Sequence, residues 1–496
     1  MLFSQLIKPL TIAFSLRGRD RREENFTHIT NDSRQVSRDS IFVCIKGAIS
    51  DGHRYARSAY ENGCRVFVAT QPLKLPADAM TMLTADTRIA LALLSIQLYR
   101  DPSHEIHVVG ITGTKGKTTS ALMTAQILNQ CGIPAGYIGS NGVEYGGKHF
   151  DTLNTTPESC DIQRYLRDMV NAGTRVCVME VSSQALKLGR VNGVRFDTCA
   201  FTNLSPDHIS AYEHPDFEDY KACKASLFRN FHHRHLIYNA DDPLAEDVVG
   251  SSRAKATRIG LYRPADLNAD GIILMRDQGR LGLQFTLHSA QGERTVELPF
   301  PGIFSVYNAL IAIAICRRFG LDDRRIIEAL KHVVICGRFE VIDLPHGATV
   351  IIDYAHNGVS LRSALETLRL YDPFRLICIF GSVGGRTQMR RAELGRVAAE
   401  LADLCILTSD NPDNEPPMDI IRDIAEQFGK DSCPYLTIPD REEAIAHAIS
   451  HSLPGDIILL AGKGHERYQL VAGRQIPFCE RDIVTRESLR ADLVHR

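Results

Sequence analysis

The chain has 496 residues, and its 57 lysines and arginines nearly balance its 59 aspartates and glutamates, so the formal charge is -2. This balance argues against a general binder of nucleic acids or of membrane surfaces, which would carry a basic face. The length predicts about three domains, and a composition with 44% hydrophobic and 23% charged residues is that of an ordinary globular protein.

The thirteen cysteines do not form a recognisable framework, because none of them occurs in a CxxC pair. Zinc ribbons and thioredoxin-like redox chemistry are therefore not expected. Residues 1–22 lack the basic start, the sustained apolar core and the cleavage site of a signal peptide, and no run of 18 apolar residues occurs in the chain. We expect a reduced, cytoplasmic protein.

Strand-like apolar runs alternate with helical patterns along most of the chain, which predicts βαβ units and an α/β fold with parallel sheets. Segment 265–300 instead predicts short antiparallel strands within a middle domain. Several of the apolar runs end in Gly, Ser, Asp or His, at the sheet edge where α/β proteins bind ligands. The clearest runs occupy residues 106–112, 176–182, 349–355, 376–382, 404–410 and 456–464.

Two passages mark the expected domain boundaries. One is a polar, proline-containing stretch at 99–105, and the other is a Gly-Arg turn in the segment 335–345. They divide the chain into three expected domains, residues 1–104, 105–337 and 338–496.

The strongest local motif is GTKGKTT, between the strand-like run 106–112 and a helical pattern. Glycines let backbone amides surround a phosphate chain, and the helix N-terminus adds positive potential. Lys117 can neutralise phosphate oxygens, and the Thr118 hydroxyl can bind Mg²⁺. The general P-loop has a glycine where this chain has Ile111, so the motif fits a shorter variant. Because we find no guanine-reading NKxD sequence, ATP is the expected nucleotide. Its expected ligands here are Gly113, Thr114, Lys115, Gly116, Lys117, Thr118 and Thr119.

Further short motifs occur in a fixed order along the chain. They are DSR at 32–34, DGH at 51–53, NTTP at 154–157, MEVSS at 179–183, TNLSPDH at 202–208, NADDP at 239–243, GRFE at 337–340, DYAHN at 353–357, DNP at 410–412 and GKGHE at 462–466. Together with GTKGKTT, this series resembles the Mur ligases, ATP-dependent enzymes that add amino acids to the UDP-MurNAc peptide of bacterial cell-wall precursors. The NTTP and MEVSS stretches are similar to those of the type that adds a diamino acid to UDP-MurNAc-L-Ala-D-Glu.

The resemblance implies both a fold and a reaction. The fold is an N-terminal UDP-binding α/β domain, a central P-loop ATPase domain with a parallel sheet, and a C-terminal Rossmann-like domain that binds the amino acid. In the implied reaction ATP converts the D-glutamyl carboxylate to an acyl phosphate, and the amine attacks it, releasing ADP and phosphate with Mg²⁺ as the cofactor. A cytoplasmic monomer is expected.

The resemblance also implies a catalytic and metal-binding set. Lys117 is expected at the phosphates, and Thr118, Glu180 and His208 are expected to hold Mg²⁺. Lys224 ends a YxxxK pattern that begins at Tyr220, and the family's lysine at this position is carbamylated by CO₂ to N6-carboxylysine. A carbamate turns a cation into an anion that can bridge metal ions. From the residue pattern alone, a solvated lysine would be favoured.

Two binding sets are implied for the nucleotides. For ATP, Ser305 stands where the family has a further asparagine, and the residues expected beyond the phosphate loop are Asn308, Arg338, Asp353, His356 and Asn357. Ordinary turn capping is the alternative for the polar members of the second set. That set, expected to hold UDP-MurNAc-dipeptide, is Asn31, Ser33, Ala48, Ile49, Ser50, Asn154, Thr155, Thr156, Ser182, Leu188 and Arg190. Arg190 could pair with a substrate carboxylate or phosphate.

The incoming amino acid is expected in the C-terminal domain. In the family, an arginine after Asp-Asn-Pro pairs with the distal carboxylate of meso-diaminopimelate, and this chain has Asp413 there. An aspartate would repel a carboxylate and tolerate an ammonium group, so L-lysine is predicted over meso-diaminopimelate, with ornithine open. The other possibility is that Asp413 points to solvent. The expected amino-acid site is Arg386, Asp410, Asn411, Pro412, Asp413, Gly462 and Glu466.

Other functions stay open at this point. Folylpolyglutamate synthetase and the fourth Mur ligase share the phosphate loop, although the N-terminal motifs and MEVSS argue against them. A nucleotide-binding paralogue without ligase activity is the alternative from another class. The departures at Ser305, Asp413 and the segment DHISAYEH keep this alternative open. The presence of Lys117, Thr118, Glu180, His208 and Lys224 argues against it.

Overall fold

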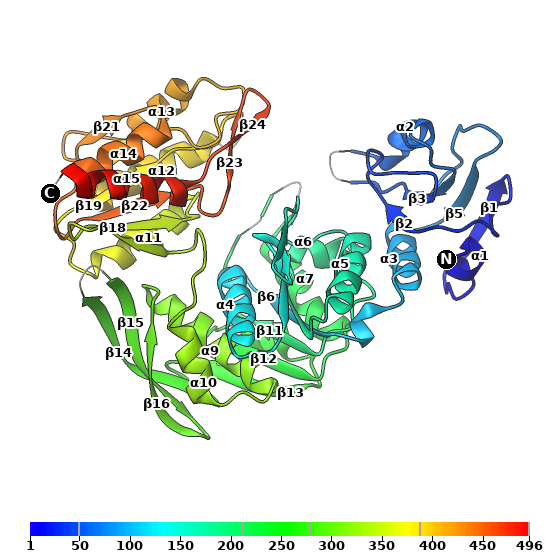
Figure 1. Ribbon diagram of the computed structural model, residues 1–496, viewed down its shortest axis with the longest axis horizontal. Coiled ribbons are helices and arrows are strands. Elements are labelled where there is room, and N and C mark those ends of the chain that lie inside the picture. The colour runs from blue at the N-terminus through cyan, green and yellow to red at the C-terminus, as the bar shows by residue number, and fades with distance from the viewer. Residues whose placement is uncertain (48–49, 208, 211–212, 278–279, 386–387, 495–496) are drawn as a thin grey trace. The chain divides into compact units, whose positions relative to one another are not determined.

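The structure, a computed structural model, describes residues 1–47, 50–207, 209–210, 213–277, 280–385 and 388–494 (Figure 1). The chain forms two compact units. The first comprises Met1–Leu267 with Leu310–Leu321, and the second comprises Asn268–Ala309 with Asp322–Arg496. Each unit is described by itself.

The N-terminal part of the first unit is a small sheet with helices packed on it. Its strands run in the order β1-β5-β4-β3-β2, and only β1 is antiparallel to its neighbour. The core lies between this sheet and two of the helices, α1 and α3, and it includes Phe3, Ile41 and Leu94. The elements are α1 (Phe3–Ile7), β1 (Phe14–Gly18), β2 (His28–Thr30), β3 (Ser40–Val43), α2 (Ala56–Glu61), β4 (Val66–Ala69), β5 (Met80–Thr84) and α3 (Thr87–Leu98).

The rest of the first unit is built on a larger, mostly parallel sheet. Its strands run in the order β13-β12-β11-β6-β10-β7-β8-β9, parallel from β13 to β7 and antiparallel beyond. The strands are β6 (His107–Thr112), β7 (Ala135–Gly139), β8 (Gly142–Tyr145), β9 (Lys148–Phe150), β10 (Val176–Glu180), β11 (Thr198–Phe201), β12 (His235–Asn239) and β13 (Lys255–Gly260). The helices are α4 (Lys117–Gln130), α5 (Ser159–Asn171), α6 (Ser183–Lys187), α7 (Phe217–Asn230) and α8 (Ala245–Val249).

The second unit begins with long strands and two helices. Strands β15 and β16 pair antiparallel, with Leu283 opposite Leu298, so the antiparallel pairing predicted for the segment 265–300 is confirmed. The strands, of 10 and 7 residues, are longer than the short ones expected. The elements are β14 (Leu267–Asp277), β15 (Arg280–Ser289), β16 (Gly292–Leu298), α9 (Ile303–Arg318) and α10 (Asp323–Leu330). The first residue of β14 and the part of α9 from Leu310 onward belong to the first unit.

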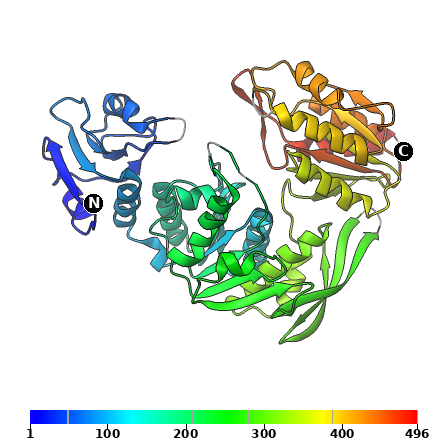
Figure 2. The ribbon, with the colours of Figure 1, turned by 180° about the vertical axis from the view of Figure 1, so that it is seen from behind.

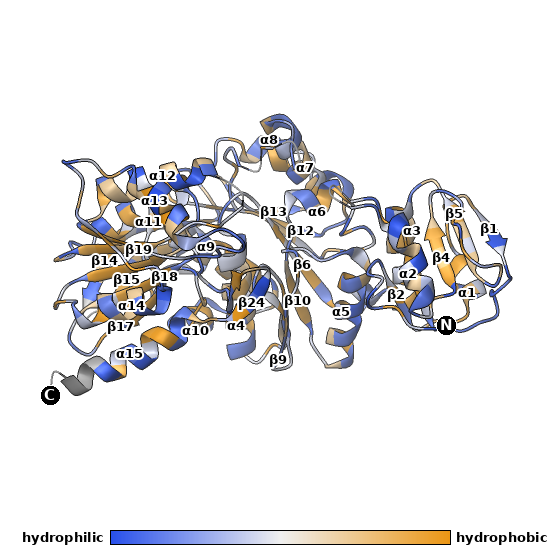
Figure 3. Cartoon of the chain, turned by 90° about the horizontal axis from the view of Figure 1, so that it is seen from above, coloured by the Kyte–Doolittle hydropathy of each residue, from blue (hydrophilic) through white to orange (hydrophobic). Residues whose placement is uncertain are grey.

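The C-terminal part of the second unit is a doubly wound sheet in the order β17-β18-β22-β19-β20-β21 (Figures 1 and 2). Helices α11, α12 and α13 pack on one face, and α14 and α15 pack on the other. Its inner strands are hydrophobic along most of their length, as the orange of β18 and β19 shows in Figure 3, because both faces are covered. The elements are β17 (Glu340–Asp343), β18 (Thr349–Asp353), α11 (Gly358–Arg369), β19 (Leu376–Phe380), α12 (Gln388–Leu401), β20 (Leu404–Leu407), α13 (Pro417–Ala425), β21 (Tyr435–Thr437), α14 (Arg441–Ser450), β22 (Ile457–Ala461), β23 (Tyr468–Val471), β24 (Arg474–Pro477) and α15 (Glu480–Val494).

The expected α/β class is confirmed. All six predicted apolar runs contain a strand, namely β6, β10, β18, β19, β20 and β22. The thirteen cysteines are all described and free. Among the helices of the described ranges, none is long and apolar enough to cross a membrane.

A buried ion pair ties α14 to α15. The side chains of Arg441 and Glu480 are fully buried, and Arg441 Nη2 lies 2.8 Å from Glu480 Oε1. We expect Arg441→Met to lower the free energy of unfolding by about 3–5 kcal/mol, because it leaves the Glu480 carboxylate buried without its cation. Arg362→Met is the control, since Arg362 pairs with Glu400 on the surface and should cost less than about 1 kcal/mol. Urea unfolding measures both; equal losses would contradict the prediction.

Candidate active site

The phosphate loop lies at the carboxyl edge of the large sheet, between β6 and α4. Gly113 and Gly116 have φ of +148° and +82°, a backbone region that favours glycine. A Cβ at Gly113 would overlap Thr202 Oγ1. The loop is fixed to the segment after β11, because the Thr114 N–H donates to Asn203 O (2.8 Å) and the Lys115 N–H donates to Asn203 Oδ1 (2.9 Å). These contacts present the N-terminus of α4 to an anion, as the motif predicts.

Two lysine ammonium groups converge on this loop from different helices. Lys117 Nζ, at the start of α4, donates to Gly113 O (2.8 Å) and Thr114 O (2.9 Å). Lys224 Nζ, from α7, donates to the same Gly113 O at 2.8 Å. Lys224 is 1% exposed. Burial, and then the charge of Lys117, lower the pKa of Lys224 well below its usual value. Lys224 is therefore not the solvated lysine that the residue pattern alone would favour.

Tyr220, one turn before Lys224 on α7, completes this contact with the loop. Its hydroxyl donates to Thr114 Oγ1 at 3.1 Å, and Lys224 Nζ lies 4.5 Å from the centre of its ring. The predicted YxxxK pattern thus places both side chains against the phosphate loop.

Glu180 is the acidic centre of the site. It ends β10, is fully buried, and accepts hydrogen bonds from Thr118 Oγ1 (2.9 Å), Tyr137 Oη (2.5 Å) and the Ser140 N–H (2.9 Å). A carboxylate and a hydroxyl beside a phosphate loop are the hard oxygen ligands that Mg²⁺ prefers, so the residues present fit this metal. His208, the third expected ligand, lies outside the described residues. Tyr137 and Ser140 were not predicted, since no motif marks them.

The residues expected to hold the peptide end of the substrate begin beside Glu180. Thr156 Oγ1 donates to Glu180 O (2.8 Å) and accepts from the Ser182 N–H (3.1 Å), and Thr155 Oγ1 lies 3.0 Å from Ser140 Oγ. Ser182 caps α6, because its Oγ accepts from the Ala185 N–H at 3.2 Å. These bonds hold the Thr155–Thr156 and Ser182 segments together next to the acidic centre.

Arg190, expected to pair with a substrate carboxylate or phosphate, has protein partners in the structure. Its guanidinium pairs with Glu158 (Nε–Oε1, 3.0 Å), while Arg88 takes the other oxygen of the same carboxylate at 3.0 Å. Arg190 also donates to Thr156 O at 3.3 Å, and Leu188 O accepts from Arg88 at 3.3 Å. Arg190 thus joins the segment before α5 through Glu158 and Thr156, and its contact with a substrate stays a prediction.

A cavity of 720 Å³ brings together residues expected at the UDP-MurNAc end. Asn31, Ser33 and Asn154 all line it, together with Tyr55 and Arg164. Ser50 Oγ donates to Tyr55 Oη at 3.1 Å. Ala48 and Ile49 lie outside the described residues.

In the second unit, the residues expected at ATP cluster around Tyr354. Arg338 lies over the Tyr354 ring at 4.9 Å, and within the described residues its buried Nε makes no hydrogen bond. Asp353 accepts from the Phe339 N–H (2.9 Å), and burial raises its pKa. A buried guanidinium nitrogen without a protein partner can donate to a bound ligand or to a water molecule.

The remaining residues of the expected ATP set lie in the segment after β18 and in α9. His356 Nδ1 lies 2.8 Å from Tyr354 O, and the Asn357 side chain caps α11 by accepting from the Ser360 N–H at 2.9 Å. Asn308 is buried in α9. Ser305, the departure from the family pattern, donates its hydroxyl to Pro301 O at 2.8 Å, in the segment just before α9.

The expected amino-acid site has a buried lysine at its centre. Lys463 Nζ donates to Asn411 Oδ1 (2.9 Å) and Glu466 Oε2 (2.8 Å), and it lies 3.6 Å from Asp410 Oδ1. Asn411 also donates to Glu466 at 2.9 Å. Gly462 has φ +114°, and a Cβ there would lie 2.8 Å from Asp410 Oδ2. Lys463 stands within the predicted GKGHE motif but was not singled out.

Two further residues of the expected amino-acid site are Pro412, which the structure describes, and Arg386, which it does not. Pro412 is buried in the loop after β20, where its carbonyl accepts from the Glu415 N–H at 3.0 Å. Arg386, expected at the α-carboxylate, lies outside the described residues.

Asp413 serves the hairpin β23–β24. Its carboxylate accepts from the Gly473 N–H (3.0 Å), its N–H donates to Leu470 O (2.8 Å), and its carbonyl accepts from the Ala472 N–H (2.6 Å). It has φ +52°, a conformation that Asp tolerates better than most residues. The Asp413 carboxylate thus stabilises a backbone turn, a structural role that does not depend on any substrate.

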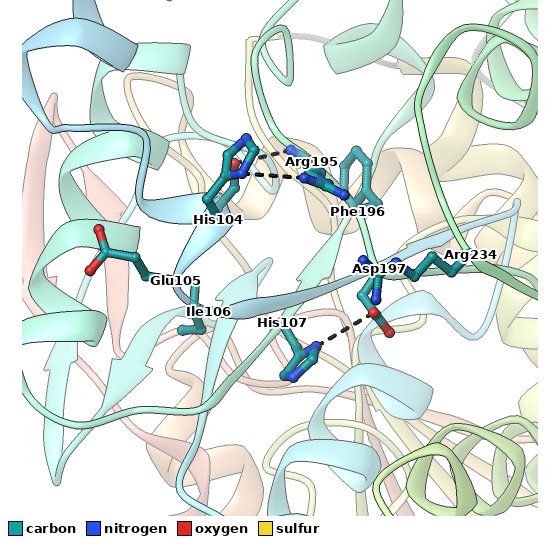
Figure 4. A pocket seen from close by; sticks show the side chains of 9 residues that line it. His104, Glu105, Ile106, His107, Arg195, Phe196, Asp197 and Arg234 are labelled. Atoms are coloured by element: carbon teal, nitrogen blue, oxygen red, sulfur yellow. Dashed lines mark hydrogen bonds and ion pairs between the residues drawn. The ribbon is translucent and has the colours of Figure 1, made fainter.

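A smaller cavity of 230 Å³ lies at the other end of the large sheet (Figure 4). It surrounds His107, the first residue of β6, whereas the phosphate loop follows the last residue of that strand. Arg195 lies 3.2 Å from His104 Nδ1, and His107 Nδ1 lies 3.4 Å from Asp197. His104 and His107 are exposed, so this cavity is a polar surface hollow at the edge opposite the expected site.

The chain matches three models of Mur ligase domains. Residues 25–93 match the catalytic domain of the Mur ligase family, residues 111–316 match the Mur ligase middle domain, and residues 337–464 match the glutamate ligase domain of Mur ligases. The chain belongs to the Mur ligase family, and it is an ATP-dependent ligase of that family.

Two curated relatives and one solved structure show which kind of Mur ligase this chain is similar to. A UDP-N-acetylmuramoyl-L-alanyl-D-glutamate--2,6-diaminopimelate ligase of Caldanaerobacter subterraneus subsp. tengcongensis is 39% identical over 91% of this chain and 92% of its own length. The same enzyme of Clostridium botulinum is 36% identical over 98% and 99%. A solved structure of a ligase with this name has a TM-score of 0.69 and 26% identity, over 100% of this chain and 99% of its own. These names do not support the prediction of L-lysine.

Proposed function

We propose that this chain joins an amino group of 2,6-diaminopimelate to the D-glutamyl carboxylate of UDP-MurNAc-L-Ala-D-Glu while ATP is cleaved to ADP and phosphate. The observation that carries the proposal is the cluster of Lys117, Lys224, Thr118 and Glu180 at the phosphate loop, in a chain whose relatives are named for this reaction. In this proposal residues 1–104 bind the uridine end, residues 105–337 bind ATP, and residues 338–496 bind the amino acid.

The residues of the chain act mainly by position and charge. A carboxylate oxygen attacks the γ-phosphorus of ATP and ADP leaves; the amine then attacks the acyl phosphate and phosphate leaves. Lys117 and the N–H groups at the start of α4 neutralise the charge that builds on phosphoryl oxygens. The Thr155–Thr156 and Ser182 segments orient the peptide carboxylate beside them.

Thr118, Glu180 and a carbamylated Lys224, with His208, would hold Mg²⁺, which neutralises phosphoryl oxygens when bound. The burial of Lys224 supports its modification. Its lowered pKa favours the neutral amine, whose nitrogen lone pair can attack CO₂, forming an N–C bond and losing a proton. The product is an anion with two oxygens, which would exchange the repulsion between Lys224 and Lys117 for attraction.

2,6-Diaminopimelate is proposed in place of L-lysine for two reasons. The relatives that match nearly the whole chain carry its name. L-Lysine would be favoured by an Asp413 carboxylate that faces the substrate, and in the structure this carboxylate accepts from the Gly473 N–H.

The test is an amino-acid panel. Purified protein is incubated with ATP, Mg²⁺ and UDP-MurNAc-L-Ala-D-Glu, and the mass of the UDP-linked product is measured with 2,6-diaminopimelate, L-lysine or L-ornithine. We expect product with 2,6-diaminopimelate in large excess over the other two. Product with L-lysine alone would overturn the choice of amino acid, and ATP binding without any product would indicate a non-catalytic paralogue.

Asp413→Asn should leave the amino-acid preference within about threefold of the original value. Asn tolerates φ > 0 and its side-chain oxygen can still accept from Gly473, so only a direct role of the charge in selection would change the ratio. The measurement is kcat/KM for 2,6-diaminopimelate divided by that for L-lysine. A shift of tenfold or more would show that the Asp413 charge faces the substrate.

A further inference from the structure

A buried histidine links two elements of the first unit that the proposed reaction needs together. His214 is 0% exposed. Its Nδ1 lies 2.6 Å from Asp219 Oδ2 on α7, and its Nε2 lies 3.0 Å from Ser183 Oγ at the start of α6. Helices α6 and α7 pack together in this region (Figure 1).

The charges around the ring define its hydrogen bonds. Asp219 also accepts from Lys187 Nζ at 2.8 Å, and the bonds from Lys187 and then His214 lower the pKa of Asp219. The Asp219 carboxylate can only accept a hydrogen bond, so we assign the Nδ1–H to this contact, and the Ser183 hydroxyl hydrogen to the contact with Nε2.

The hydrogen bonds of His214 lie between two parts of the proposed site, the Ser182–Ser183 turn and the phosphate loop. Ser183 follows Ser182, which is bonded to Thr156 beside Glu180. On the other side the His214 ring packs edge-on against Tyr220 at 5.2 Å, and Tyr220 is bonded to Thr114 of the phosphate loop. The backbone carbonyl of His214 also accepts from the Ser210 N–H at 2.9 Å.

The arrangement Ser183–His214–Asp219 has the order of a nucleophilic triad, but its burial excludes that use. The ring is inaccessible and Ser183 is 5% exposed, so a substrate carbonyl has no room to approach the hydroxyl. The bonds therefore serve to hold elements in place.

We propose that His214 is a positioning residue that fixes the Ser182–Ser183 turn, and with it the peptide end of the substrate, relative to the α7 helix that carries Tyr220 and Lys224. The inference rests on the proposed function, because it assumes that Ser182 faces the UDP-MurNAc-dipeptide. Without the link the turn would still form, but its distance from the phosphate loop would vary.

The test uses variants that break one bond at a time. Ser183→Ala removes the hydroxyl, and His214→Asn places an amide near the Nδ1 position, which keeps the bond to Asp219 and loses the bond to Ser183. We expect each to raise KM for UDP-MurNAc-L-Ala-D-Glu by about tenfold, as loss of one buried hydrogen bond allows. The double variant should be no worse than the worse single variant. His214→Gln, whose side chain reaches the Nε2 position, should restore part of the loss.

The affinity for ADP shows whether a variant has lost its structure in general, because such a loss would weaken ADP binding as well. The Kd for ADP, measured by calorimetry, should stay within about twofold in all variants, since Lys224 and Tyr220 keep their own bonds to the phosphate loop. His233→Asn is the matched control, because His233 also joins a serine, Ser252 (2.7 Å), and a backbone oxygen, Phe231 O (2.9 Å), elsewhere in this unit.

The outcomes separate the inference from the proposed function. If the unmodified protein makes no product with any diamino acid, the proposed function fails and the inference falls with it. If the unmodified protein makes product and KM is unchanged in Ser183→Ala and His214→Asn, the inference alone is overturned. An equal rise of KM in His233→Asn, or additive effects in the double variant, would also overturn it.

Discussion

Lys224→Ala is expected to lower kcat by about 10²–10³-fold, the cost typical of removing one group that stabilises transition-state charge. Lys224 is buried against Gly113 O of the phosphate loop, and its carbamate would place a negative group where Mg²⁺ is needed. Alanine removes both this anion and the side chain that fills the space. Steady-state kinetics with saturating ATP, UDP-MurNAc-L-Ala-D-Glu and 2,6-diaminopimelate measure the loss.

Chemical rescue distinguishes the carbamate from a lysine that only packs. A small carboxylate such as acetate should restore part of the turnover of Lys224→Ala, because it can occupy the space of the carbamate. Lys221→Ala is the control, since Lys221 lies on the same helix and pairs with Glu218 at the surface. Undiminished activity in Lys224→Ala would remove the carbamate assignment, and rescue by ammonium compounds instead of carboxylates would show that the cation is the active form.

Glu180→Gln is expected to lower kcat by a similar factor, about 10²–10³-fold, and to raise the Mg²⁺ concentration needed for half-maximal activity. Glutamine has nearly the same shape, but it replaces one anionic oxygen by an NH₂ group. That group cannot accept hydrogen bonds from Tyr137 or Thr118, and it cannot bind a metal ion. Titration of activity with Mg²⁺ measures the second effect.

Glu246→Gln is the matched control for Glu180→Gln. Glu246 accepts a hydrogen bond from Tyr238 Oη at 2.8 Å, so this variant also disturbs a Tyr–Glu pair, at a position outside the proposed site. We expect its activity and its Mg²⁺ requirement to match those of the unmodified protein. A Glu180→Gln variant with normal Mg²⁺ dependence would contradict the role of Glu180 at the metal.

The fold was predictable wherever strands are buried on both faces. The residues of β22, IILLA, are all buried, and such continuous apolar runs stand out in the sequence. Strands β8 and β9 were missed because they are short, with four and three residues, and because β9 is mostly exposed. The sequence did contain a signal for these two strands, the pair Gly146-Gly147 between them. Both glycines have φ > 0, as a two-residue hairpin turn requires.

The site was predictable where a motif places functional groups next to one another in sequence. The phosphate loop is such a case. Side chains whose partners are distant in sequence were not predictable. Arg190 is occupied by Glu158, 32 residues away, and Asp413 is occupied by Gly473, 60 residues away. An expectation based on charge alone cannot include a partner that only the folded chain supplies.

The most direct test of the central claim, an amide ligase that activates a carboxylate with ATP, follows one oxygen atom. UDP-MurNAc-L-Ala-D-Glu labelled with ¹⁸O in the D-glutamyl γ-carboxylate is incubated with ATP, Mg²⁺, 2,6-diaminopimelate and the protein, and the released phosphate is analysed by mass spectrometry. The account predicts one ¹⁸O atom per phosphate from fully labelled carboxylate, with phosphate released only when both the peptide substrate and the amino acid are present. Unlabelled phosphate, or phosphate released without the peptide substrate, would contradict it.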